Sequence, residues 1–101
     1  MQLVQDNAEA QRFELLVDDV LAGFAQYVRR GGRLVFTHTE VDPSFGGRGL
    51  GGVLAGAALD AARAEGVKVV PLCTFIAGYI GKHPEQADLV DQELLGRFDA
   101  E

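Results

Sequence analysis

The sequence predicts an α+β fold: a meander of antiparallel strands, then a helix, a parallel strand and a second helix, all in one mixed sheet. Three observations predict it. Apolar residues alternate with polar ones in the N-terminal part, they recur at helical spacing directly after a glycine-rich loop, and a short apolar run follows that helix. A chain of 101 residues suffices for one core, so we expect residues 1–101 to form a single domain.

The N-terminal part is expected to form strands joined by tight turns. Two alternating runs carry this prediction: Phe13, Leu15 and Val17, then Val20, Ala22 and Phe24. The segment "LVDDVLAGFAQYV" also has helical spacing, but Gly23 would weaken a helix by about 1 kcal/mol relative to Ala. The pairs Asp18–Asp19 and Gly31–Gly32 suit tight turns, and the meander is therefore favoured.

The C-terminal half predicts a helix, a strand and a second helix. From Gly49 to Glu65 the apolar residues lie on one helical face, and Gly66 closes that helix. The run "VKVVPL" predicts a buried strand that Pro71 ends or leaves at an edge. "TFIAGYIGKH" predicts a shorter helix that stops before Pro84, and "DQELLGRF" a last turn or two of helix.

Charge and composition restrict the classes of function. Fifteen acidic and nine basic residues give a net charge of −6, which argues against a general nucleic-acid binder. No apolar run approaches the roughly 20 residues of a membrane span, so no membrane partner is expected. The N-terminus lacks a secretory signal and the single Cys cannot form an internal disulfide, so we expect a cytoplasmic protein.

The stretch "SFGGRGLGG" places glycines at the mouth of the predicted helix. The first amides of a helix have no intrahelical partner, and a loop without side chains lets a phosphate reach them. A P-loop is excluded because no Lys, Ser or Thr stands at the helix start. Gly47, Gly49 and Gly52 match the dinucleotide pattern G-x-G-x-x-G, but the acid that the ribose needs about 20 residues later is absent. The loop therefore predicts a phosphate site of another kind.

The segment "EVDPSFGGRGLGGVLAGAALDAARAEG" resembles the acetyl-CoA-binding segment of the GNAT acetyltransferase superfamily, in which a Q/R-x-x-G-x-G/A loop opens a helix. The six positions are here Gly46, Gly47, Arg48, Gly49, Leu50 and Gly51. Gly46 departs from the pattern, because Arg or Gln is usual there. The layout from "FELLVDD" to "LCTFIAGYIGKHPEQADLV" is similar to small GNAT-like proteins, which implies a minimal GNAT-like fold.

The resemblance implies an N-acetyltransferase that binds acetyl-CoA and passes the acetyl group directly to an amine: a protein Lys, an N-terminus or a small amine. It also implies that backbone groups around Glu40 and Val41 pair with the pantetheine arm and that loop amides hold the pyrophosphate. The implied cosubstrate-binding residues are Val41, Gly47, Arg48, Gly49, Leu50, Gly51 and Gly52.

Acetyl transfer needs a base that frees the amine and an acid that protonates the departing thiolate. The resemblance implies Tyr79 as the acid and places Cys73 near the thioester, as a proton donor or an acyl carrier. Glu40, or His38 on the same strand face, is the candidate base. Tyr79 and Cys73 also fit plain packing roles, and His83 fits a helix cap or a contact to a CoA phosphate. Two His and one Cys, widely separated, predict no metal site.

Larger members of the superfamily carry extra helices and strands that wall the acceptor site. In a chain of this length the acceptor cleft is open, completed by a second subunit in a homodimer, or absent. Two alternatives to an enzyme stay open: a non-catalytic CoA- or acyl-CoA-binding module, and a protein-interaction domain in which the glycine loop is only a tight connection.

Overall fold

The computed structural model describes residues 1–99 and contains one five-stranded sheet whose strand order follows the chain. The first four strands are antiparallel, and the fifth is parallel to the fourth, so the predicted mixed sheet of an α+β fold is confirmed. The strands are β1 (Gln2–Asn7), β2 (Arg12–Val17), β3 (Val20–Arg30), β4 (Arg33–Val41) and β5 (Lys68–Pro71). The helices are η1 (Pro43–Phe45), α1 (Leu50–Glu65), α2 (Thr74–Lys82), η2 (Pro84–Leu89) and α3 (Gln92–Asp99).

Both predicted tight turns are present. Asp18 and Asp19 have φ angles of 49° and 68°, and the pair Gly31–Gly32 also has positive φ at both residues. Two positive φ angles in sequence make the turn type whose twist matches that of the flanking strands. The two turns join β2 to β3 and β3 to β4.

One predicted alternation is wrong. A register shift opposite Leu15 and Leu16 marks a β-bulge in β3 at Ala22. An extra residue in a strand moves all later side chains to the other face. Ala22 is buried in the core, but Phe24 does not follow it there, and Val20 is 54% exposed.

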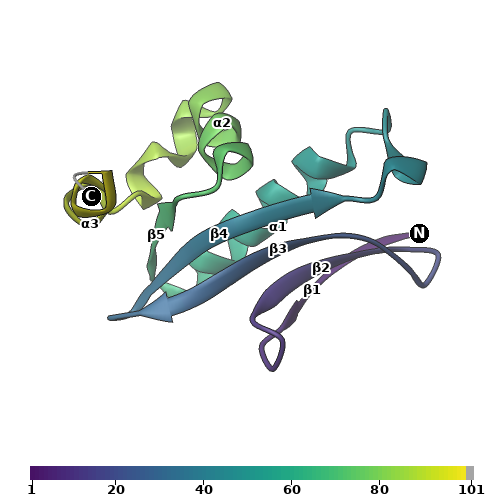
Figure 1. Cartoon of the computed structure of the whole chain (residues 1–101), viewed down its shortest axis with the longest axis horizontal. Coiled ribbons are helices and arrows are strands. Elements are labelled where there is room, and N and C mark those ends of the chain that lie inside the picture. The colour runs from purple at the N-terminus through teal and green to yellow at the C-terminus, as the bar shows by residue number, and fades with distance from the viewer. Residues whose placement is uncertain (100–101) are drawn as a thin grey trace.

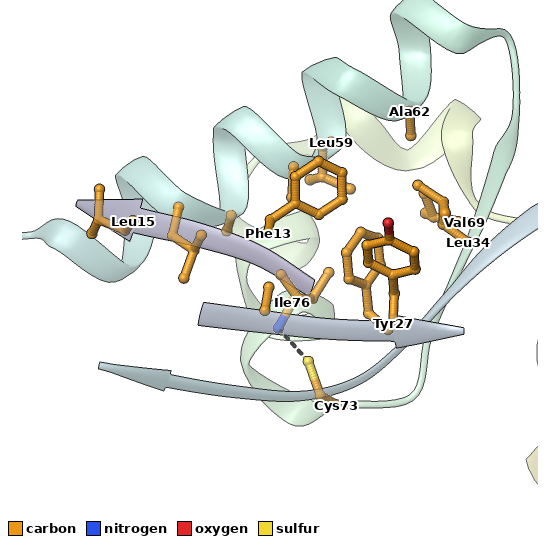
Figure 2. Packing of buried hydrophobic residues seen from close by; sticks show 14 of the residues in the cluster. Phe13, Leu15, Tyr27, Leu34, Leu59, Ala62, Val69, Cys73 and Ile76 are labelled. Carbon is orange, nitrogen blue, oxygen red and sulfur yellow. Dashed lines mark hydrogen bonds between the residues drawn. The ribbon is translucent and has the colours of Figure 1, made fainter. Parts of the chain in front are cut away.

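The hydrophobic core lies between α1 and one face of the sheet (Figures 1 and 2). Ala55, Ala58 and Ala62 are fully buried, and side chains this small let the helix lie close to the strands. The large side chains of the core include Phe13, Leu15, Tyr27, Leu34, Phe36, Leu50, Leu54, Leu59, Val69 and Ile76. The predicted helix start differs by one residue, since Gly49 is the N-cap and Leu50 the first helical residue.

The elements after α1 follow the predicted order. β5 ends at Pro71, and α2 stops before Pro84. After η2 the chain returns to β5, where Val90 forms a single parallel bridge with Val69. In Figure 1, α2 lies beyond the end of β5, and α3 lies at the side of the molecule away from β1 and β2. Across residues 1–99, no helix is both long and apolar enough to cross a membrane.

Candidate functional site

The candidate site lies where β4 and β5 separate. The two strands pair only as far as Phe36 and Pro71, although β4 continues to Val41. Proline has no N–H to continue the ladder. The next two amides, of Leu72 and Cys73, both donate to the Phe36 carbonyl oxygen at 3.0 Å, and the chain then enters α2. Beyond Phe36, no strand within residues 1–99 covers this edge of β4.

The backbone of Val41 faces the uncovered edge. The next amide, that of Asp42, donates to the Ala22 carbonyl oxygen at 2.7 Å, in the direction of β3. Along a strand, successive residues direct their backbone groups to opposite sides. The N–H and C=O of Val41 therefore point away from β3, and an extended ligand could pair with them as an added strand.

Cys73 links the end of this ladder to α2. It is the N-cap of α2, where its Sγ accepts a hydrogen bond from the Ile76 amide at 3.4 Å (Figure 2). Its Sγ also lies 3.3 Å from Oγ1 of Thr39 on β4. The side chain is only 8% exposed and belongs to the core cluster. Cys73 thus caps a helix and also lies at the strand separation, next to the uncovered edge.

The glycine loop leads from the end of β4 to α1. The Asp42 carboxylate accepts hydrogen bonds from the backbone amide and the hydroxyl of Ser44, and these bonds, that of the amide first, hold the pKa of Asp42 below its usual value. The guanidinium of Arg48 lies 5.4 Å from the ring centroid of Phe45. Gly47 and Gly49 have φ angles of 79° and 70°, and a Cβ on either would meet nothing within 4 Å.

The N-terminus of α1 is suited to an anion. Gly49 offers no side-chain cap, and the first turn contains no acidic residue. The amides of that turn have no intrahelical acceptor, and the helix dipole adds partial positive charge. Donors without an acceptor, beside open space, can accommodate a phosphate group.

Gly51, Gly52 and Gly56 also have a packing role, which the sequence analysis missed. A Cβ on Gly51 would lie 2.5 Å from Cζ of Phe75, and one on Gly56 would lie 2.9 Å from the Tyr79 hydroxyl oxygen. The first turns of α1 are thus in direct contact with aromatic side chains of α2. The spacing of these glycines along the helix could have indicated a close packing contact, but it does not identify α2 as the element that makes this contact.

Tyr79 lies apart from Cys73. Six residues along a helix correspond to about 9 Å along its axis. The Tyr79 hydroxyl is directed at Gly56, and its ring stacks on His83 with centroids 4.0 Å apart and an interplanar angle of 26°. The structure therefore pairs Tyr79 with His83, and Cys73 with Thr39.

Glu40 lies on the sheet face opposite Cys73. Its neighbour Thr39 contacts Cys73, and consecutive strand side chains alternate between faces. As their period-two spacing predicts, His38 and Glu40 lie together, with Nε2 of His38 3.2 Å from Oε1 of Glu40. Both side chains are more than half exposed.

A cleft of about 390 Å³ adjoins Glu40 on the strands β3 and β4. Its lining includes Leu21, Phe24, Glu40, Val41 and Asp42. It therefore combines two carboxylates with apolar surface and reaches the residue whose backbone faces the uncovered edge. No group of three His, Cys, Asp or Glu within residues 1–99 is arranged to hold a metal ion.

A comparison with protein families gives a match over most of the chain. A family model described as a GCN5-related N-acetyl-transferase matches residues 12–89, from the start of β2 to the end of η2. The match includes the separating strands, the glycine loop, α1 and α2. A comparison with curated proteins finds no match.

Proposed function

The chain belongs to the GCN5-related N-acetyltransferase family, and from this premise we propose that it binds acetyl-CoA and transfers the acetyl group directly to an amine. Membership of the family supports acetyl transfer in general. The identity of the cosubstrate and that of the acceptor are part of our proposal. One observation carries it: the glycine loop leads from β4, whose edge is left uncovered where β4 and β5 separate, to a helix N-terminus that has no side-chain cap.

Each part of acetyl-CoA has a proposed place in this arrangement, beginning with its pyrophosphate. The pyrophosphate is held by the amides from Gly47 to Gly52, with Arg48 as the cation of the loop. The protein is acidic overall, so such a local site is what allows it to hold a polyanion. The pantetheine arm pairs with the backbone of Val41 along the uncovered edge. Gly46 contributes no side chain to the binding of the pyrophosphate, whereas the pattern that the loop resembles has Arg or Gln at that position.

The amine acceptor approaches from the sheet face that carries Glu40, opposite the face that carries Cys73. Acetyl-CoA supplies an activated thioester. Glu40, in its cleft beside His38, takes the proton that the amine must lose, and Tyr79 protonates the departing thiolate. Cys73 lines the site near the thioester. The acceptor is an amine of a protein Lys, an N-terminus or a small molecule.

Calorimetric titration with acetyl-CoA, NAD and ATP in parallel tests the binding step. We expect acetyl-CoA to bind most tightly, and Gly49→Asn to weaken it at least about tenfold, a loss of about 1.4 kcal/mol. Asn tolerates the left-handed backbone of Gly49, but its side chain would occupy the phosphate space and compete for the amides.

Gly66→Asn is the matched control. Gly66 has a φ of 74° and open space around it, as Gly49 does, but it lies at the other end of α1. Its substitution should leave acetyl-CoA affinity unchanged. Absence of binding at millimolar acetyl-CoA, or an equal loss in both variants, would contradict the proposal.

Turnover separates the enzyme from a module that only binds CoA. Release of free CoA thiol, followed with a panel of amines, should depend on Glu40 and decrease in Glu40→Gln. Tight binding without thiol release from any amine would instead support the non-catalytic module, in which Cys73 and Tyr79 have only the packing contacts described above.

A further inference from the structure

A row of three leucines crosses the sheet on the face opposite the core. Leu3, Leu16 and Leu21 are direct cross-strand partners on β1, β2 and β3, and we call them the leucine row. Leu15 and Val17 are buried in the core, so Leu16 between them points to the other face, as do its partners. Leu3 is 46% exposed and Leu21 is 40% exposed. The row is therefore apolar surface that the core does not use.

The leucine row connects two pockets. Leu21 lines the cleft of about 390 Å³ that contains Glu40, whereas Leu3 and Leu16 line a pocket of about 210 Å³ that also includes Asp19 of the β2–β3 turn. In Figure 1 this turn lies at the same end of the sheet as the end of β4. Neighbouring strands lie about 4.8 Å apart, so the row is about 10 Å long from β3 to β1. About three residues of extended polypeptide cover that length.

The charges around the leucine row are mostly negative. The cleft is lined by the carboxylates of Glu40 and Asp42 and by no Lys or Arg. In the smaller pocket, Asp18 lies 2.5 Å from the α-ammonium of Met1, whereas Asp19 forms no ion pair within the described part of the chain, residues 1–99. Apolar surface bordered by carboxylates is complementary to a polypeptide in which an apolar side chain stands beside basic ones.

A second copy of this chain would fit the surface poorly. In a two-fold dimer the same patch faces itself, so the carboxylates around the row would be brought close to their own copies. Arg12, whose guanidinium lies 4.8 Å from the ring centroid of Phe24 in the cleft, is already paired with Glu14 at 2.7 Å. The charges therefore favour a cationic partner over self-association.

We propose that the leucine row and Asp19 dock the polypeptide that carries the acceptor amine, a Lys side chain that enters the cleft beside Glu40. One apolar side chain of the polypeptide lies on the row, and one basic side chain pairs with Asp19. The inference rests on the proposed function and narrows its acceptor to a Lys in a basic, partly apolar segment of a protein. It also adds a docking surface outside the cleft, through which the protein selects its acceptor by the residues that flank the Lys.

Release of CoA thiol with three end-blocked peptides tests the inference. In each peptide a single Lys is the only amine, and it is flanked by Arg and Leu, by Ser, or by Glu and Leu. We expect the KM of the basic peptide to be about tenfold lower than that of the Ser peptide, through one exposed ion pair and one apolar contact. The Glu peptide should have the highest KM, and the differences due to charge should decrease as salt is raised.

Two variants and a control separate docking from chemistry. Asp19 has a φ of 68°, which Asn tolerates, so Asp19→Asn removes the charge and keeps the turn. It should raise the KM of the basic peptide about two- to fivefold and leave that of the Ser peptide and the affinity for acetyl-CoA unchanged. Leu3→Thr, which keeps a good strand former, should also raise the KM of the basic peptide. Asp60→Asn, which removes the same charge from the exposed side of α1, should change neither peptide's KM.

The possible failures are distinguishable. Equal KM values for the three peptides, faster acetylation of spermidine or of a peptide N-terminus, or an Asp19→Asn variant that affects the basic and Ser peptides alike would overturn the inference. Each of these outcomes leaves the proposed function standing. Absence of thiol release from every amine, together with absence of acetyl-CoA binding, would overturn the proposed function.

Calorimetric titration with the basic peptide in the absence of acetyl-CoA measures docking without turnover. Binding that is weaker in Asp19→Asn than in wild type would support the docking surface even where the proposed function fails. Absence of binding at millimolar peptide would overturn it.

Discussion

Cys73 connects α2 to two positions on β4. Its Sγ accepts a hydrogen bond from the Ile76 amide of α2 and contacts Thr39 of β4. Its backbone amide donates a hydrogen bond to the Phe36 carbonyl oxygen of β4. The same residue is the candidate nearest to the strand separation. The proposed chemistry and the architecture therefore involve the same side chain, and substitutions have to be chosen to separate the two.

Cys73→Ser and Cys73→Ala should separate them. Serine is a better helix N-cap than cysteine, so we expect Cys73→Ser to stay close to wild-type stability. Alanine leaves the Ile76 amide without its acceptor and should lower the free energy of unfolding by about 1 kcal/mol, measured by chemical denaturation. Because we place the thiol beside the thioester, CoA release should decrease in both variants. A Cys73→Ser variant with wild-type turnover would reduce Cys73 to its capping role.

The structural role of a residue can depend on how two elements pack together, as Gly23 illustrates. In the sequence it counted only as a residue that weakens a helix. In the structure it lies beside the bulge of β3, where a Cβ would come within 2.6 Å of the Glu40 carbonyl oxygen and 3.2 Å of the Val41 Cα. The glycine thus allows β3 to approach the part of β4 that carries the candidate base.

We expect Gly23→Ala to destabilise the protein by about 2 kcal/mol, because both contacts are with backbone and the strands would have to separate. Gly96→Ala is the matched control. Gly96 lies in α3 with open space around it, so alanine should raise the free energy of unfolding by about 0.5–1 kcal/mol through its better helix propensity. Denaturant titration of both variants measures the difference. Equal effects of the two substitutions would show that the close approach of β3 and β4 contributes nothing.

The same distinction explains how much the sequence could predict. Features that depend on neighbouring residues were predicted and are present. They are the turns at Asp18–Asp19 and Gly31–Gly32, the helix α1 with its glycines at both ends, and the shared face of His38 and Glu40. The bulge at Ala22 depends on how two strands pair, which no local pattern specifies.

The candidate site divides in the same way. The loop and its helix were predictable from the glycines, and the family resemblance agrees with the family match. The contact of Thr39 with Cys73 joins residues 34 positions apart and depends on where β4 and β5 separate. The packing of Phe75 on Gly51 depends on how two helices meet.

At the scale of the whole molecule, ion pairs tie the helices to the sheet and to each other. Arg29 of β3 donates two hydrogen bonds of 2.9 Å to Glu65 at the end of α1, and Arg63 of α1 donates two of 2.8 Å to Asp88 of η2. These bonds hold the pKa values of both carboxyl groups below their usual range. Asp91 has a lowered pKa as well, first because the Leu94 amide donates to it and then because Arg33 does.

These lowered pKa values predict a loss of stability on the acid side. A carboxyl group whose pKa is lower in the folded protein binds more protons when unfolded, so the stability it provides is present above its unfolded pKa and is lost as the pH falls below that value. The ordinary values are 4.5 for Glu65 and 3.8 for Asp88 and Asp91. The melting temperature should therefore fall from about pH 5 downward. Arg63→Gln should make that fall shallower, because Asp88 would then titrate nearer its ordinary value. An unchanged acid slope in Arg63→Gln would contradict the assignment to this pair, since general charge repulsion at low pH acts on both proteins alike.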